Sequence, residues 1–389
     1  MTPMNEQEKQ LSYPLGDALP ALGTTLEVAP GVRWVRMDLP FALNHINLWL
    51  LRDELDGADG KVQGWTIVDC GITNDATRGA WEQVFANELG GLPVLRVICT
   101  HMHPDHLGLG HWLTEKWGVR LWISATDYNV ARVASGIPGA VGVSSALFMQ
   151  SHGVTDPEAI AKIKGRTNYY ASMVPKIPAR YRRLLDGDVL QIGGHAWTCH
   201  AGYGHAPEHM SLHCPDIECA HEAPAAHAAP AAPATGGGVP GLEVARRPRG
   251  VLISGDMVLP RISTNVSVFD IEPEANPLPL YLASIARMKA LPADTLVLPS
   301  HGRPFRGLHT RIDQLTQHHD DRFAEVLAAC AEAPQSAADL LMVLFKRKLD
   351  LHQTTFAMGE SIAHLHALWL GGKLVRRVDA QGVYRFSRA

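Results

Sequence analysis

The stretch Thr100-His-Met-His-Pro-Asp-His-Leu-Gly108 is the most informative part of the sequence, because it places three imidazoles and one carboxylate within six positions. Neutral imidazole and carboxylate are the ligands of hydrolytic zinc-type sites. The preceding residues 93–100 are mostly apolar, which is typical of a strand buried on both faces. The ligands therefore lie where a buried strand ends and a loop begins. His101 and His103 can point to one side while Asp105 and His106 lie one turn further on, so one run could serve two metal ions.

Three more apolar stretches are followed by residues of the ligand type, each beside a Gly or a Ser. His205 comes shortly after residues 196–200, Asp256 follows residues 251–255, and His301 follows residues 295–300. A single His beside a strand is more often structural than a ligand. Four such strand ends, one of them densely populated, favour a shared metal site over coincidence.

Together these motifs resemble those of the metallo-beta-lactamase superfamily over about residues 30–310. The H-x-H-x-D-H run is residues 101–106, the G-H-x-x-x-H element is residues 204–209, the S-G-D element is residues 254–256, and the late histidine is His301. The resemblance implies two ligand sets joined by a bridging Asp256, namely His101, His103 and His205 for one ion, and Asp105, His106 and His301 for the other. With an Asp rather than a Cys at position 256, the chain resembles the hydrolase branch of the superfamily that contains glyoxalase II-like thioesterases, lactonases and nucleases, more than true beta-lactamases.

The reaction type follows from these ligands. Two neighbouring cations lower the pKa of a shared water and polarise the group under attack, so the resemblance implies hydrolysis by a metal-bridging hydroxide. No Ser or Cys nucleophile is required. We expect two divalent ions, with zinc as the default and iron or manganese as alternatives at the oxygen-richer position. Asp105 is the candidate catalytic residue, since it would orient the hydroxide or pass a proton to the leaving group.

Two further residues are candidates for orienting the ligands. Asp69 ends another buried strand, residues 65–69, and ligating imidazoles usually donate their second N–H to such a carboxylate. The alternative for Asp69 is a cap for the helix that follows. His209 lies four residues after His205, and it either orients a ligand or hydrogen-bonds within its own loop.

The composition of the chain limits its number of domains, its partners and its location. The chain has 389 residues, 46% of them hydrophobic, which suffices for one large domain and a small one. Its formal net charge of -4 creates no global basic field, which argues against nucleic acid or an anionic membrane as partner. The six cysteines show no disulfide-like spacing, the first ten residues lack an apolar signal region, and no apolar run approaches the length of a membrane span. We therefore expect a cytoplasmic protein without a membrane span.

Strand and helix patterns alternate along the first three quarters of the chain. Residues 43–51, 64–70 and 119–124 predict strands, while residues 76–89 place apolar side chains at helical spacing. Strands from both halves with helices outside predict an αββα sandwich with the metal cleft at one edge. We assign residues 1–310 to this catalytic domain.

Residues 136–186 exceed what the metal scaffold requires, and we interpret them as a helical cap. Basic residues stand there beside Tyr, Phe and Met, a combination that suits an amphipathic anion such as an acyl-CoA. The alternative is a solvated basic face. The candidate substrate-binding residues are Tyr169, Tyr170, Arg180, Arg182 and Arg183.

Two segments stand apart from this scaffold. Residues 214–249 change abruptly to Ala, Pro and Gly, which predicts a flexible loop between two strands. Residues 311–389 predict three helices, at 312–331, 336–348 and 357–370, and a hairpin. This tail resembles the C-terminal winged-helix module of lactamase-like endoribonucleases, notably at residues 359–365. Its groove-reading helix, residues 358–370, contains no Lys or Arg, so we favour a packing or dimerisation module over RNA binding.

These observations predict a binuclear metal-dependent hydrolase that cleaves a small-molecule thioester or related acyl ester, of the acyl-CoA or acylglutathione type. A metal-dependent endoribonuclease and a lactonase are the alternative enzymes. A metal-binding scaffold is the alternative that is not an enzyme.

Overall fold

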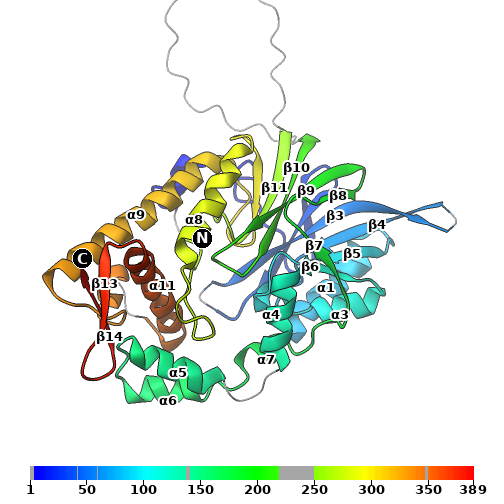
Figure 1. The fold of residues 1–389 in the computed structure, drawn as a ribbon. Helices are drawn as coiled ribbons and strands as arrows, with labels where there is room; N and C mark the ends of the chain where they lie inside the picture. Colours follow the sequence, from blue (N-terminus) through cyan, green and yellow to red (C-terminus); the bar gives the residue numbers. More distant parts are fainter. Residues whose placement is uncertain (1–3, 42, 59, 137–140, 219–248, 347–348) are drawn as a thin grey trace, which may run out of the picture.

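The fold is built on two β-sheets whose apolar faces pack against each other (Figure 1). The computed structural model describes residues 4–41, 43–58, 60–136, 141–218, 249–346 and 349–389. Trp34 and Trp49 of the first sheet and Trp197 of the second are fully buried in the core between the sheets. No helix in these ranges is both long and apolar enough to cross a membrane.

In the described ranges the first sheet has seven strands, in chain order from one edge to the other. Its first four strands are antiparallel and the last four are parallel, so the carboxyl ends of β4, β5 and β6 meet at one edge. The strands are β1 (Thr25–Ala29), β2 (Val32–Asp38), β3 (His45–Gly57), β4 (Gly60–Val68), β5 (Val94–Ile98), β6 (Leu121–Ser124) and β7 (Tyr181–Leu184).

Over the same ranges the second sheet has five strands in the order β12-β11-β10-β9-β8. The parallel pair β11 and β12 ends at the same edge as the turn between β9 and β10, and these ends carry the remaining ligand-type residues. Its strands are β8 (Val189–Ile192), β9 (His195–Gly202), β10 (His209–Glu218), β11 (Arg249–Gly255) and β12 (Leu296–Pro299). Of the predicted loop at 214–249, residues 214–218 belong to β10 and Arg249 to β11, while 219–248 lie outside the described residues.

Helices cover the outer face of each sheet, which confirms the predicted sandwich. The outer face of the first sheet packs in one core with helices that present Trp81, Leu113 and Tyr128. These are α1 (Asp75–Asn87), α3 (Gly110–Trp117) and α4 (Ala125–Gly136), with the short α2 (Pro104–Leu107) inside the metal loop. The outer face of the second sheet packs on α8 (Pro277–Arg287) and on helices from the end of the chain. Two short 3-10 helices lie before the first strand and directly after α8, η1 (Glu8–Gln10) and η2 (Met288–Ala290).

The predicted cap is only partly helical. It contains α5 (Val141–Ser151), α6 (Pro157–Lys164) and α7 (Tyr169–Met173), as expected. Its last residues are not helical, because Tyr181–Leu184 pairs in parallel with β6 and forms edge strand β7 of the first sheet. Arg182 and Arg183 therefore belong to the sheet and not to the cap helices.

The C-terminal residues form two long helices and a hairpin that pack on the second sheet and the cap. Leu365 and Phe386 share one core with Leu252 and Val297 of the second sheet and with Phe148 of the cap. The elements are α9 (Leu308–Glu332), α10 (Leu341–Leu344), α11 (Leu351–Leu370), β13 (Leu374–Val378) and β14 (Tyr384–Arg388). Of the predicted middle helix at 336–348, the described residues 336–346 form only the single helical turn α10, residues 347–348 lie outside the described ranges, and the winged-helix assignment stays a prediction.

Candidate metal centre

The metal loop leaves the first sheet at the end of β5 and turns sharply. The Thr100 amide donates to Asp69 Oδ1 at 2.7 Å, which fixes the point where the strand stops. Pro104 begins α2, and the amide of His106 donates back to the carbonyl of His103 at 3.0 Å. This single turn brings His106 onto the same side of the loop as His101, with ring centroids 3.9 Å apart.

The first group of ligand-type atoms comes from both sheets. It consists of one atom each from His101, His103, His205 and Asp256, all within 4.8 Å of one another. His101 Nε2 lies 2.9 Å from His103 Nδ1 and 3.2 Å from His205 Nε2. Ring nitrogens this close leave room for a shared cation and for little else. This is the ligand set that the family resemblance implies for one ion.

The second group is formed by Asp105, His106 and His301, whose ligand atoms also lie within 4.8 Å of one another. Asp256 stands between the two groups. Its Oδ2 lies 3.2 Å from His205 Nε2, while its Oδ1 lies 3.5 Å from both His106 Nε2 and His301 Nε2. One carboxylate therefore turns one oxygen to each group, as a bridging ligand would.

Two buried atoms indicate that these groups fit metal ions. Among the described residues, His106 Nε2 and Asp256 Oδ1 are buried and have no hydrogen-bond partner, which is costly unless a cation binds there. Three of the rings already donate their Nδ1–H to protein oxygens, which leaves each Nε2 lone pair directed at the centre. The acceptors are Asp69 Oδ2 for His106, the Asn265 carbonyl for His205, and the His45 carbonyl for His301.

The charge states suit divalent cations as well. Burial, and then the neighbouring imidazoles, lower the pKa of His101 and His103 well below the usual value, so both rings are neutral ligands at pH 7. Burial alone would raise the pKa of Asp256, but His301 and His106 hold it well below its usual range. The neutral rings of His101 and His103 and the ionised Asp256 thus offer nitrogen and oxygen donors that zinc, iron or manganese accept.

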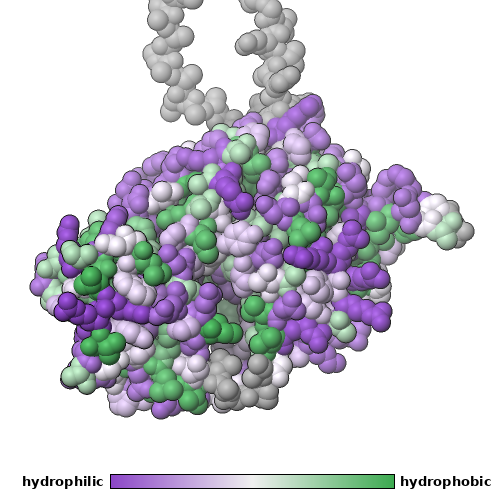
Figure 2. All heavy atoms as spheres, viewed as in Figure 1, coloured by the Kyte–Doolittle hydropathy of each residue, from purple (hydrophilic) through white to green (hydrophobic). Residues whose placement is uncertain are grey.

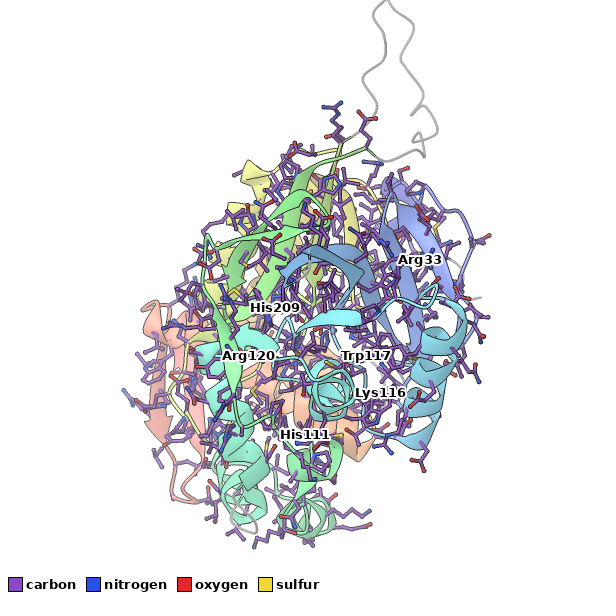
Figure 3. All side chains as sticks on the ribbon, turned by 90° about the vertical axis from the view of Figure 1, so that its right-hand side faces the viewer. Arg33, His111, Lys116, Trp117, Arg120 and His209 are labelled. Atoms are coloured by element: carbon purple, nitrogen blue, oxygen red, sulfur yellow. The ribbon has the colours of Figure 1, made fainter. Side chains whose placement is uncertain are left out.

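Asp69 and His209 both lie against the centre. Asp69 is fully buried, has a left-handed φ of 64°, and accepts from His106 Nδ1 at 2.9 Å. The helix that follows is capped by Asn74, which accepts from the Thr77 amide, so the alternative role of Asp69 as a helix cap is wrong. His209 accepts a hydrogen bond from the Asp256 amide at 3.2 Å and so contacts the bridging residue. His209 is fully buried, and in Figure 3 it lies apart from Lys116 and Trp117 of helix α3.

The predicted substrate-binding residues divide into two places. Tyr170 donates its hydroxyl to the Met102 carbonyl at 2.6 Å and so touches the metal loop, and Tyr169 beside it is 41% exposed. Arg180, Arg182 and Arg183 are exposed on or next to edge strand β7, where the Arg182 guanidinium stacks on Trp122. Only the two tyrosines therefore belong to the cap.

Two buried residues next to the centre were missed by sequence reasoning. Asn47 donates its side-chain amide to the carbonyls of Pro299 and Gly302, on both sides of His301. Asp127 accepts from the amides of Met102 and Glu208, in the two loops that carry the first ligand group. Neither lies in a metal motif, and the available signal was a polar residue buried inside or directly after an apolar strand.

Comparison with known proteins places this centre in a family. The family model for the metallo-beta-lactamase superfamily matches residues 45–218, and that for the metallo-beta-lactamase-like C-terminal domain matches residues 323–389. A beta-lactamase domain protein from Burkholderia ambifaria is 51% identical; the match covers 99% of this chain and 100% of that chain, with a TM-score of 0.85. The chain belongs to the metallo-beta-lactamase superfamily.

Two more distant relatives extend the likeness over both parts of the chain. A metallo-beta-lactamase family protein from Thermus thermophilus is 26% identical; the match covers 93% of this chain and 100% of that chain, with a TM-score of 0.66. The probable metallo-hydrolase YqjP of Bacillus subtilis (strain 168) is 22% identical over 343 residues, which are 86% of this chain and 91% of the relative. This chain is therefore a metallo-hydrolase of this superfamily, and its two groups of His and Asp residues could bind metal ions.

Proposed function

We propose that this metallo-hydrolase cleaves a thioester or related acyl ester at a centre of two divalent metal ions, zinc by default. The observation that carries the two-metal proposal is Asp256, whose two oxygens face two separate ligand groups. When bound, such ions supply a water of lowered pKa and polarise the carbonyl under attack.

The protein's own groups divide the remaining work. The neutral rings of His101 and His103 and the ionised Asp256 hold the centre in a fixed geometry. Asp105 differs from the other carboxylate, because 20% of its side chain is exposed against 10% for Asp256. An open side is where a leaving group departs, so Asp105 is the group placed to take the proton that the attacking water loses and pass it to the leaving group.

Exposed apolar residues in segments that lead away from the centre support an acyl substrate with an apolar part. The carbonyl of Asn265 accepts from His205, and Phe269 and Ile271 further along the same segment are 46% and 76% exposed. On the cap side Tyr169 is exposed and lies under the guanidinium of Arg166. Figure 2 shows apolar side chains at the lower edge of the molecule, where Figure 1 places cap helices α5 and α6. Apolar surface with a cation beside it suits an amphipathic anion better than a polar nucleic acid.

A substrate panel tests the proposal. Zinc-loaded protein is assayed with an acyl-CoA, an acylglutathione, a lactone and single-stranded RNA, and the His103→Ala variant serves as the control for contaminating hydrolases. We expect hydrolysis of a thioester by the wild type and its loss in the variant. Cleavage of RNA or of the lactone alone would contradict the thioesterase proposal and leave the metallo-hydrolase assignment intact.

A second experiment tests the cap as the binding surface for the anionic part of the substrate. Arg166→Glu should raise the KM for an acyl-CoA several-fold and leave that for a short uncharged ester unchanged, because only the CoA carries phosphates. Arg120→Glu, at an exposed position before the amino end of β6 and so opposite the metal loops, is the matched control and should change neither KM. An equal rise for both substrates in Arg166→Glu would argue against the cap as a binding surface.

A further inference from the structure

Asp127 is a buried carboxylate that no metal motif includes. It lies in the first turn of α4, directly after β6, and its side chain is fully inaccessible to solvent. Its Oδ1 accepts from the Met102 amide at 2.8 Å, and its Oδ2 accepts from the Glu208 amide at 2.7 Å. Although burial raises the pKa of Asp127 to about 6, the group is ionised at pH 7, and both oxygens act as acceptors.

The two donors lie in the two loops that carry the first ligand group. Met102 stands between His101 and His103 at the end of the first sheet. Glu208 follows His205 by three residues in the turn between β9 and β10 of the second sheet. Glu208 is held a second time, since its side chain accepts from the Thr126 hydroxyl at 2.8 Å. One short segment of α4 therefore fixes a loop from each sheet.

We infer that Asp127 is a positioning residue that sets the separation of the His103 and His205 loops and thereby the affinity of the first metal position. The inference rests on the two-metal centre of the proposed function. The second position has its own supports, because His301 is held through His45 and Asn47 and His106 through Asp69. Loss of Asp127 should thus weaken one position and spare the other.

The sharpest variant is Asp127→Asn. An amide has one acceptor oxygen, so one of the two loops loses its partner and faces an NH2 group instead. Removal of such orienting groups typically lowers metal affinity by roughly 10- to 100-fold. Asp53→Asn is the matched control, because Asp53 is equally buried but accepts from Thr66 and Arg96, away from both ligand loops.

The experiment titrates metal-free protein with Co²⁺ alone and follows its visible absorption, in a double-mutant cycle. In the His301→Ala background, which retains the first position, Asp127→Asn should lower the affinity of the remaining ion at least about tenfold. In the His103→Ala background, which retains the second position, the same change should leave the affinity within about twofold. Asp53→Asn should have no effect in either background.

Equal weakening in both backgrounds, or none in either, would overturn the role of Asp127. Wild-type protein that binds fewer than two Co²⁺ ions would instead contradict the two-metal centre, so the two failures are distinguishable. If Asp127→Asn does not fold, Asp127→Glu keeps both acceptor oxygens at a changed distance. Any loss of Co²⁺ affinity caused by Asp127→Glu must then also be confined to the His301→Ala background.

Discussion

At the scale of single residues, Asp69 joins the strand end to the ligand shell. Its carboxylate accepts from the Thr100 amide and from His106 Nδ1, and all three groups are buried. Both donors lose their partner in Asp69→Ala, and each buried unsatisfied donor costs about 1–3 kcal/mol. We therefore expect a lower free energy of unfolding, measured with urea on metal-free protein, together with weaker metal binding.

The control for Asp69 is Asn74→Ala. Asn74 caps α1 from the same loop, and loss of a cap costs about 1 kcal/mol. That variant should lose stability while its metal affinity stays unchanged. If Asn74→Ala bound metal as weakly as Asp69→Ala, the metal affinity would depend on the general stability of this loop and not on the hydrogen bond between Asp69 and His106.

Asp105 allows a separate test of proton delivery. Asp105→Asn retains the shape of the side chain but cannot carry a proton to a leaving group, and positioned acids contribute about 10²- to 10⁴-fold in rate. We expect kcat to fall at least about 100-fold while one metal ion remains bound in the first group. The readouts are kcat and metal content on the same sample, and full turnover would rule out a role for Asp105 in the reaction.

The sequence predicted the ligands far better than the residues that hold them. His101, His205, Asp256 and His301 could be predicted because ligand-type residues directly follow apolar strands. The role of Asp127 was missed because it binds backbone amides 25 and 81 positions away, and any residue type can present an amide. Contacts of that kind depend on how the two sheets pack, which no local pattern encodes.

At the scale of elements, the backbone at the end of β11 determines the position of the bridging ligand Asp256. Gly255 has a φ of 53°, and a Cβ built there would lie 2.1 Å from His209 Nε2. Gly255→Ala should therefore displace His209 and, through its bond to the Asp256 amide, the bridging carboxylate. We expect weaker binding of both metal ions, measured by Co²⁺ titration.

Gly250→Ala on the same strand is the matched control. Gly250 also has a positive φ, of 96°, but its added Cβ would have no neighbour closer than 3.6 Å. Backbone strain is thus present in both variants and the clash with His209 in only one. Equal loss of metal affinity in the two variants would mean that strain in β11, rather than the position of His209, determines the effect.

Two elements were predicted with the wrong structure, each for a physical reason. Arg182 and Arg183 did not suggest a strand, because an edge strand with exposed side chains has no apolar pattern, and only pairing with β6 defines it. Residues 336–348 have helical composition, yet Ser336 and Asp339 bond each other and the amide of Ala338 donates to the carbonyl of His152 in the cap. Local and tertiary bonds thus replace most of that helix.

At the scale of the whole molecule, buried histidines should make the fold sensitive to acid. Burial lowers the pKa of His152 to about 4 and that of His364 to about 4. Between about pH 4 and 6.5 the unfolded chain then binds more protons than the folded one, so stability falls as the pH is lowered, by up to about 1.4 kcal/mol per pH unit for each group.

The measurement is urea unfolding of metal-free protein at pH 7.5, 6.5 and 5.5. His152→Asn can still donate to the Phe148 carbonyl, as His152 Nδ1 does at 2.9 Å, but it does not titrate. Its stability should therefore depend less steeply on pH than that of the wild type. Identical slopes in the two proteins would exclude His152 as a source of the acid sensitivity.

The core that the cap, the second sheet and the C-terminal module share has a consequence for biosynthesis. Phe148 and Ile160 of the cap pack in the same core as Leu365 of α11. The roughly 180 residues between α7 and α11 take on the order of 10–40 s to translate, and during that time the part of this core that α11 covers stays open. The nascent chain should therefore depend on chaperones that shield the cap until α11 has left the ribosome.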